Sequence, residues 1–114
     1  MNKGNFLAVL LLLSTPALAD QGGSPAAGQP LVIDVRSLAE YQQVHIRQAV
    51  NIPYEQIAGR IAALAPDQNA RIVLYCRSGR RSGIAEQTLR QLGYNQVENK
   101  GGLDDMRRIG YQTD

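Results

Sequence analysis

The sequence CRSGRRS, which spans residues 76–82, contains the only cysteine of this 114-residue chain. A cysteine acts as a nucleophile in its thiolate form, and nearby arginines favour that form because they lower the pKa of the thiol. Arg77, Arg80 and Arg81 stand close to Cys76 in the sequence. Their guanidinium groups also present several N–H donors in a geometry that suits oxyanions. The segment therefore predicts a nucleophilic thiolate beside an anion-binding site.

The backbone of the same segment is expected to take part. Cys76 follows an apolar run and precedes a segment with helical spacing that starts at about residue 81. The N–H groups of a short loop that leads into a helix point toward one spot and bind an anion there. Gly79 permits the positive φ that a tight loop needs. We therefore predict Cys76 as the catalytic residue and, as substrate-binding residues, Arg77, Ser78, Gly79, Arg80, Arg81 and Ser82.

Strand-like and helix-like segments alternate along the chain, which predicts an α/β domain with a parallel sheet flanked by helices. Residues 71–75 lack the alternation of a half-exposed strand, so we expect them in the middle of the sheet. Ser37 and Glu40 have the spacing of a capping box, which predicts a short helix through about Val44. The other expected strands are 31–33, 49–52 and 96–99, and the other expected helices are 54–65, 81–92 and 104–108.

Apolar residues at helical spacing mark the expected buried faces of two of these helices. The faces are Tyr54, Ile57, Ala58, Ile61, Ala62, Leu64 and Ala65 in the first, and Ile84, Ala85, Thr88, Leu89 and Leu92 in the second. Gly93 is expected to end the second helix, and Gly101-Gly102 to form a turn. Open parallel sheets bind ligands outside the carboxyl ends of their strands, which is where Cys76 is expected to lie.

The first nineteen residues have the order of a secretory signal peptide. Lys3 supplies positive charge, residues 6–13 are unbroken apolar, and Ala17 and Ala19 form an A-x-A cleavage pattern before Asp20. The apolar run is shorter than the ~20 residues that span a bilayer, so we expect cleavage rather than a membrane anchor. The expected product is a periplasmic protein, free of the membrane, with a flexible tether at 20–30 and one domain at 31–114.

Composition narrows the expected partners. The formal net charge of +2 gives no reason to expect binding to nucleic acid or to an anionic membrane.

The single cysteine is unusual for a small exported domain. Such domains usually rely on disulfides, which a single cysteine cannot form within its chain, and a free thiol is easily oxidised outside the cytoplasm, which is a disadvantage unless the thiol has a use. With one histidine, His45, and one cysteine, we expect no metal site. We also expect no organic cofactor, and a monomer.

The loop resembles the active-site loop of rhodanese-type sulfurtransferases, which in single-domain members commonly reads C-x-x-G-x-R-S. Other motifs of that family occur in the same order, and the resemblance covers about residues 31–111. It is strongest to the small exported members of the phage-shock-protein E type. The matching residues are Asp34-Val35-Arg36, Glu40-Tyr41, His45-Ile46, Ala49, Asn51-Ile52-Pro53, Gly93-Tyr94 and Gly101-Gly102.

The resemblance implies a thiosulfate sulfurtransferase that moves sulfane sulfur through a Cys76 persulfide to cyanide or to a thiol acceptor. Its partners would be thiosulfate and that acceptor. Arg77 and Arg81 would hold the sulfonate of thiosulfate, and Arg80 would steer the anion toward the site. Asp34 and Arg36, which match the family's D-V-R motif, are expected as supporting residues. No metal or organic cofactor is implied.

The sequence also departs from the family pattern. Val44 and Gln48 stand where glycine is usual, and Met106 stands where an aromatic residue is common. The strand and helix that usually precede Asp34 are largely missing, so the sheet is expected to have about four strands. None of these departures removes a residue of the loop.

Two other functions remain open at this point. A Cys-dependent phosphatase or arsenate reductase is one alternative, although related phosphatases use Cys-x5-Arg and residues 76–81 are Cys-x4-Arg. A non-catalytic sulfur- or anion-binding module is the other, although such modules typically lack the cysteine. His45 is the only candidate for a Cys–His dyad, and a structural hydrogen-bonding role is the alternative for it.

Overall fold

The sheet has four parallel strands in the order β2-β1-β3-β4. The computed structural model describes residues 28–114, so the predicted signal peptide, and the predicted tether up to residue 27, lie outside the described residues. The strands are β1 Leu31–Asp34, β2 Val50–Asn51, β3 Arg71–Cys76 and β4 Gln96–Gly102. The predicted fold class, an α/β domain with a small parallel sheet of about four strands, is confirmed.

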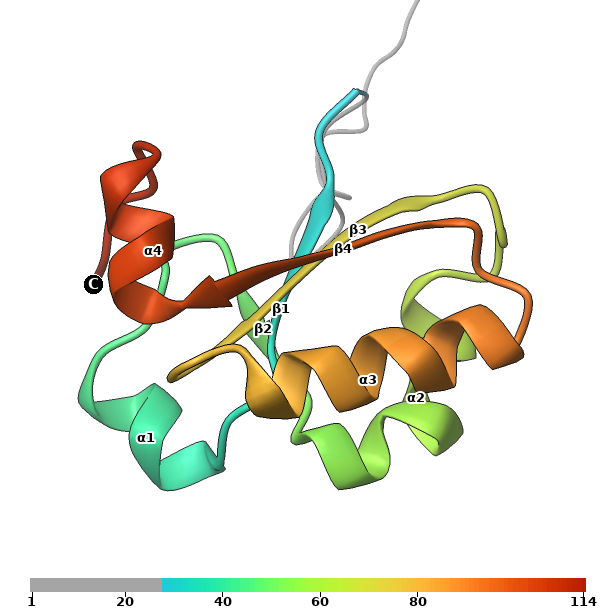
Figure 1. The fold of residues 1–114 in the computed structure, drawn as a ribbon, viewed down its shortest axis with the longest axis horizontal. Helices are drawn as coiled ribbons and strands as arrows, with labels where there is room; N and C mark the ends of the chain where they lie inside the picture. Colours follow the sequence, from blue (N-terminus) through green and yellow to red (C-terminus); the bar gives the residue numbers. More distant parts are fainter. Residues whose placement is uncertain (1–27) are drawn as a thin grey trace, which may run out of the picture.

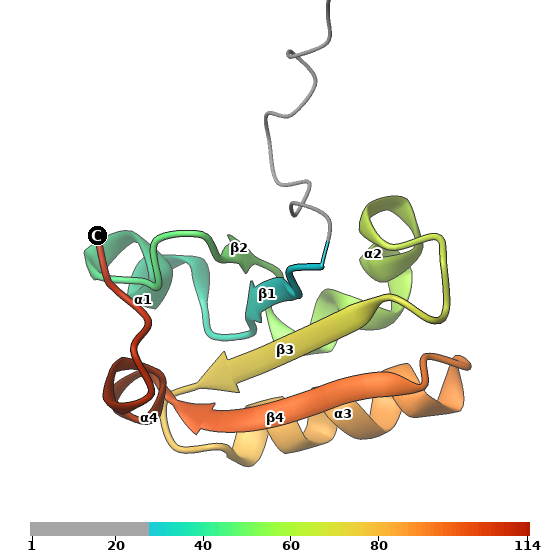
Figure 2. The same ribbon diagram turned by 90° about the horizontal axis from the view of Figure 1, so that it is seen from above.

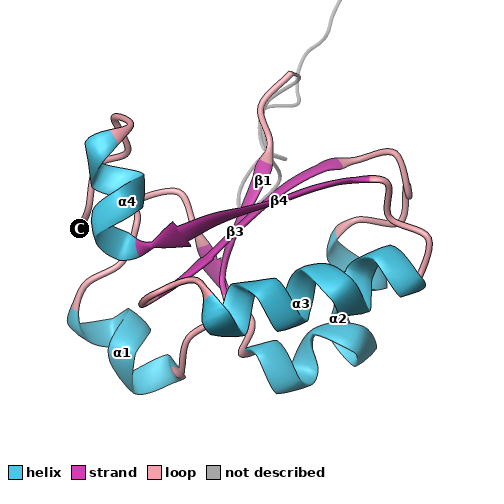
Figure 3. Ribbon diagram, viewed as in Figure 1, coloured by secondary structure: helices cyan, strands magenta, loops and turns pink. Residues whose placement is uncertain are grey.

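Helices cover both faces of this sheet (Figure 3). Helices α2 and α3 lie side by side along one face, whereas α1 and α4 lie toward the ends to which the strands point (Figure 1). In Figure 2, β4 leads directly into α4, and α3 runs along β3 and β4. The helices are α1 Leu38–Gln43, the 3-10 turn η2 Tyr54–Gln56, α2 Ile57–Leu64, α3 Arg80–Gln91 and α4 Leu103–Arg108.

Strand β3 lies between β1 and β4 and is buried from Ile72 to Cys76, as its apolar sequence predicts. Because successive side chains of a strand point to opposite faces, Ile72 and Leu74 belong to the core under α2 and α3, and Val73 and Tyr75 to the core on the opposite face. Each large apolar side chain buried in this way stabilises the fold by about 1.5–3 kcal/mol. Side chains packed on both faces of the sheet therefore hold β3 in place up to Cys76.

The buried faces of α2 and α3 are narrower than predicted. Helix α2 buries Ile57 and Ile61, whereas Ala58 and Ala62 are exposed. Helix α3 buries Ser82, Ala85 and Leu89, but Ile84 and Leu92 are 39% and 41% exposed. The reason is geometric, because neighbouring residues of a helix point about 100° apart and a helix on a sheet contacts it along one side only.

The capping box of α1 is present as predicted. Ser37 Oγ accepts from the Glu40 N–H at 3.2 Å, and Glu40 Oε1 accepts from the Ser37 N–H at 3.1 Å. Val44, at the end of α1, has an extended backbone with φ of −163°, so this position does not need the glycine that is usual there. Met106, in place of the usual aromatic residue, is fully buried in the core beside Tyr75.

The end of β4 differs from the prediction. The strand was expected to stop at Asn99 and to be followed by a turn, but it continues to Gly102, which pairs with Cys76 after a shift in register. Gly101 has a φ of +89°, a conformation that glycine adopts without strain, and this accommodates the extra residue. A Cβ at Gly102 would overlap the carbonyl group of Arg77, so this glycine lets the strand touch the cysteine loop.

Gly102→Ala is expected to lower the free energy of unfolding by about 1–3 kcal/mol, the usual cost of overpacking a closely packed site. Gly59→Ala is the matched control, because nothing lies within 4 Å of a Cβ added there. Since alanine is favoured over glycine in a helix by about 0.5–1 kcal/mol, the control should be neutral or stabilising. Urea unfolding measures both, and equal effects of the two substitutions would contradict the close contact.

Candidate active site

Cys76 is the last residue of β3, and it is buried, with 1% of its surface exposed. Its sulfur accepts a hydrogen bond from the Gly79 N–H at 3.0 Å and lies 3.3 Å from Ser82 Oγ. The backbone N–H groups of Ser78 and Ser82 also favour a negative sulfur. The loop therefore forms the predicted cradle of N–H donors, with the cysteine sulfur at its centre.

The cradle changes the acidity of the thiol. Burial by itself raises the pKa of Cys76, but the hydrogen bonds from the Ser82 side chain and from the loop N–H groups outweigh it, and the net pKa is lowered. Hydrogen bonds to the charged form of a group stabilise that form. The direction of the shift agrees with the sequence prediction of a reactive thiolate.

The loop turns at Gly79, which has a φ of +101° and begins helix α3 as its N-cap. The helix starts at Arg80, one residue earlier than predicted. Ser82, on the first turn, is fully buried, and its hydroxyl reaches the sulfur of Cys76. The first turn of α3 and the end of β3 together therefore surround the sulfur.

Asn99, on β4, holds this loop and was not predicted as a site residue. Its Nδ2 donates to the Gly79 carbonyl at 3.0 Å, and its Oδ1 accepts from Ser82 Oγ at 2.7 Å and from the Gly101 N–H at 2.9 Å. The only sequence signal for such a role is an asparagine two residues before a pair of glycines. That pattern does not indicate which distant groups it contacts.

The three arginines of the loop have different surroundings. Arg77 and Arg80 are exposed. Arg81 is partly buried and binds both carboxylate oxygens of Glu40, at 2.9 Å and 3.1 Å. The hydrogen bonds from Arg81 are the main reason that the pKa of Glu40 falls to about 2. The sequence predicts Glu40 as a helix-capping residue and as part of the family's motif, and the structure adds this long-range contact to the cysteine loop.

A cleft of about 260 Å³ lies beside the loop, between α1 and the start of α4. Arg77, the residue that follows Cys76, is part of its wall. Both basic and acidic side chains line it, so it suits a small polar or charged molecule. The lining residues are Arg36, Glu40, Gln43, Val44, Arg77, Leu103 and Asp104.

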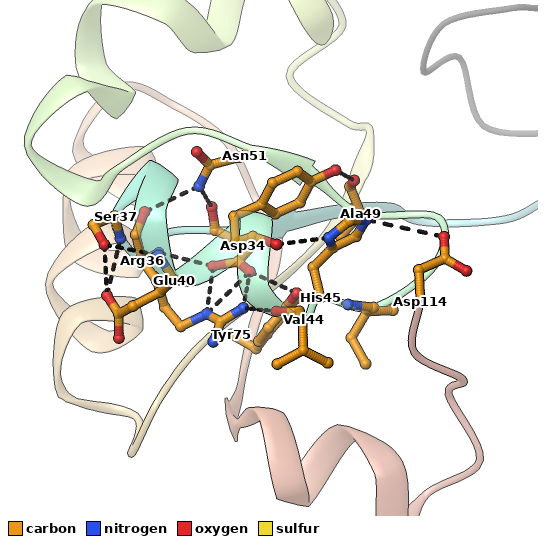
Figure 4. Close-up of polar contacts among 12 residues, drawn as sticks. Asp34, Arg36, Ser37, Glu40, Val44, His45, Ala49, Asn51, Tyr75 and Asp114 are labelled. Atoms are coloured by element: carbon orange, nitrogen blue, oxygen red, sulfur yellow. Dashed lines mark hydrogen bonds and ion pairs between the residues drawn. The ribbon is translucent and has the colours of Figure 1, made fainter.

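The two residues predicted as supporting, Asp34 and Arg36, form a buried ion pair at the end of β1 (Figure 4). The Arg36 side chain donates to both carboxylate oxygens of Asp34, with a shortest distance of 2.6 Å, and also to the Val44 carbonyl at 2.7 Å. Tyr75 Oη donates to Asp34 Oδ2 at 2.7 Å, and burial raises the pKa of Tyr75, so its hydroxyl stays protonated. Since Tyr75 precedes Cys76, the Asp34–Arg36 pair holds the C-terminal end of β3, where the cysteine lies, in place.

His45 contacts Tyr41 and Asp114. Its Nδ1 is 2.7 Å from the Tyr41 carbonyl oxygen, its ring stacks on the Tyr41 ring with centroids 3.8 Å apart, and its Nε2 is 4.0 Å from Asp114 Oδ2. The polar contacts of the Cys76 sulfur are with the loop and Ser82 instead. The geometry favours a structural role for His45 over a Cys–His dyad.

The sequence was compared with models of known protein families. The model of the rhodanese-like domain family matches residues 18–108. The chain belongs to the rhodanese family. Members of this family share the fold described above, as the solved structure titled "rhodanese with anions from E. coli" shows. That structure is 43% identical, superimposes with a TM-score of 0.68, and the match covers 73% of this chain and 94% of the other.

Two sequence relatives extend the comparison. The rhodanese chain is 41% identical over 106 residues to the thiosulfate sulfurtransferase PspE of Escherichia coli, and the match covers 93% of each protein. It is 38% identical over 81 residues to a sulfurtransferase of Allochromatium vinosum, which covers 70% of this chain and 74% of the relative. The family predicted from the motifs is therefore confirmed.

Within residues 28–114, no helix has the length and apolar character needed to cross a membrane. In the same range, no cluster of three or more histidine, cysteine, aspartate or glutamate side chains is arranged to hold a metal ion.

Asp34→Ala is expected to lower the free energy of unfolding by about 3–5 kcal/mol, because it leaves the Arg36 charge buried without its partner. Asp104→Ala is the control, because Asp104 is 77% exposed and pairs with Arg107 on the surface. Surface ion pairs contribute little, so that variant should unfold at nearly the same urea concentration as the wild type. A small effect of Asp34→Ala would contradict the assigned supporting role.

Proposed function

We propose that this rhodanese is a thiosulfate sulfurtransferase that carries sulfane sulfur as a persulfide on Cys76. The observation that carries the proposal is the sulfur of Cys76 at the centre of the loop N–H groups, where a negative sulfur is stabilised. The 41% identity over 93% of the chain to an E. coli protein named as a thiosulfate sulfurtransferase supports the choice of donor.

The reaction has two steps. The Cys76 thiolate attacks the outer sulfur of thiosulfate, a new S–S bond forms, and the original S–S bond breaks so that sulfite leaves with its electron pair. The terminal sulfur of the resulting persulfide is then attacked by cyanide, which gives thiocyanate, or by a thiolate acceptor, which gives its persulfide. The Cys76 thiolate is regenerated in either case. Such covalent routes give ping-pong kinetics.

The cradle stabilises negative charge in both steps. The N–H groups of the loop are fixed before the reaction, so they cost no rearrangement when charge moves onto or away from the sulfur. Arg77 lies at the cleft beside the loop, and its guanidinium is suited to the sulfonate oxygens of thiosulfate. Arg81 keeps N–H groups for a ligand while Glu40 holds it in place. The exposed Arg80 serves in this proposal to steer the anion.

The activity is tested with thiosulfate and cyanide as substrates and thiocyanate as the measured product. We expect parallel lines in double-reciprocal plots, the pattern of a ping-pong reaction, and loss of turnover in Cys76→Ser. Hydrolysis of an aryl phosphate or reduction of arsenate, without thiocyanate formation, would favour the phosphatase-like alternative. Equal activity of Cys76→Ser and wild type would overturn the catalytic role of Cys76, and inactivity of both in all three assays would favour a binding module.

Arg81→Ala is expected to lower kcat/KM for thiosulfate by roughly tenfold to a hundredfold, as for loss of a hydrogen bond to a charged ligand of about 1.5–3 kcal/mol. Arg80→Ala should have a smaller effect that fades as salt is added, because salt screens exposed charges. Steady-state kinetics of both variants at low and high salt measure this. Equal small losses would mean that the backbone N–H groups alone hold the anion.

We also propose that the protein is exported to the periplasm and that its mature form starts at Asp20. The support is the positive start, the apolar run of residues 6–13 and the A-x-A pattern before Asp20. N-terminal sequencing of the protein from a periplasmic fraction should give Asp20 as the first residue. Recovery in the membrane fraction with Met1 intact would contradict export with cleavage.

A further inference from the structure

We propose that Asn99 is a positioning residue for the Cys76 thiolate, which acts by fixing the Ser82 hydroxyl and the Gly79 peptide beside the sulfur. This role of Asn99 rests on the function proposed above for Cys76, and it makes that cysteine more reactive. Asn99 does not contact the sulfur in the structure. It contacts two groups that surround it, through both ends of its side-chain amide.

The orientation of the Asn99 amide is set by its partners. Its Oδ1 accepts from the Gly101 N–H at 2.9 Å, and a backbone N–H can only donate. Its Nδ2 donates to the Gly79 carbonyl at 3.0 Å, and a carbonyl can only accept. The reversed amide would face both partners with the wrong group. One side chain of β4 is thus tied to its own backbone and to the loop at the same time.

The hydroxyl of Ser82 has one proton and three acceptors within reach. They are Asn99 Oδ1 at 2.7 Å, the Gly79 carbonyl at 3.2 Å and the Cys76 sulfur at 3.3 Å. The Gly79 carbonyl already accepts from the Gly83 N–H and from Asn99 Nδ2, each at 3.0 Å. While Cys76 is a neutral thiol, the shortest contact therefore takes the Ser82 proton, and Ser82 Oγ accepts the S–H.

Ionisation of Cys76 reverses the last of these bonds. When the thiol loses its proton to solvent, the Ser82 hydroxyl turns its own proton toward the negative sulfur. Asn99 Oδ1 then keeps the bond from the Gly101 N–H, so it is not left without a donor. The Ser82–Asn99 bond by itself therefore favours the neutral thiol. Asn99 favours the thiolate through position, because it holds Ser82 Oγ and the Gly79 carbonyl in place beside the sulfur, and the bond that the hydroxyl then donates to a charged sulfur is the stronger one.

The position of Asn99 makes the proposal testable without unfolding the protein. Its side chain is exposed, in contrast to the fully buried Ser82, so a smaller residue opens no cavity. Asn95, just before the start of β4, is a matched control. It is also an exposed asparagine, and its side chain donates to Asn69 Oδ1 at 2.8 Å, at the opposite end of the strand from the loop.

The experiment is the rate of Cys76 alkylation by iodoacetamide as a function of pH. We expect Asn99→Ala to raise the midpoint by about one pH unit, a tenfold change in the ionisation constant, and Asn95→Ala to leave it unchanged. Asn99→Asp should raise it further, because it places a negative charge near the thiolate and against the Gly79 carbonyl. Thermal unfolding of each variant separates these shifts from a general loss of stability.

The double variant Ser82→Ala/Asn99→Ala tests whether Asn99 acts through Ser82. We expect its midpoint to lie well below the value given by adding the two single shifts, since residues in one network are not additive. An unchanged midpoint in Asn99→Ala, or fully additive shifts, would overturn the proposal. The assay needs no thiosulfate, so lack of sulfurtransferase activity in the wild type would refute the proposed function and leave this result intact.

Discussion

The need to stabilise a negative charge on a buried sulfur atom is the constraint on which the rest of this structure depends. Removing a charge from water costs several kcal/mol unless hydrogen bonds replace the lost solvation. In this protein the replacement comes from N–H groups of residues 78, 79 and 82 and from the Ser82 hydroxyl. These donors sit within six residues of Cys76 along the chain, so a short loop must be held in one conformation for the thiolate to persist.

The fold holds that loop from two sides. On one side, β4 comes so close that Gly102 touches the Arg77 backbone, and Asn99 binds the loop through its amide. On the other side, the Asp34–Arg36 pair fixes Tyr75 at the end of β3. Since the carboxyl ends of parallel strands meet at one edge of the sheet, residues far apart in sequence meet there around the cysteine.

Much of this arrangement could be predicted from the sequence, because it depends on local patterns. The apolar run of β3, the capping box at Ser37 and the loop after Cys76 are each encoded within a few neighbouring residues. The contacts of Asn99 and of Glu40 with the loop could not be predicted, since they join residues 17–41 positions apart. The extension of β4 to Gly102 could not be predicted either. A pair of glycines predicts a turn as readily as a strand with a shifted register.

The central claim is that Cys76 carries the transferred sulfur. The most direct measurement is the intact mass of the protein after incubation with thiosulfate, without reductant. We expect a gain of one sulfur atom that cyanide removes and that Cys76→Ala abolishes. An unchanged mass after thiosulfate, or a sulfur that stays bound in Cys76→Ala, would contradict it.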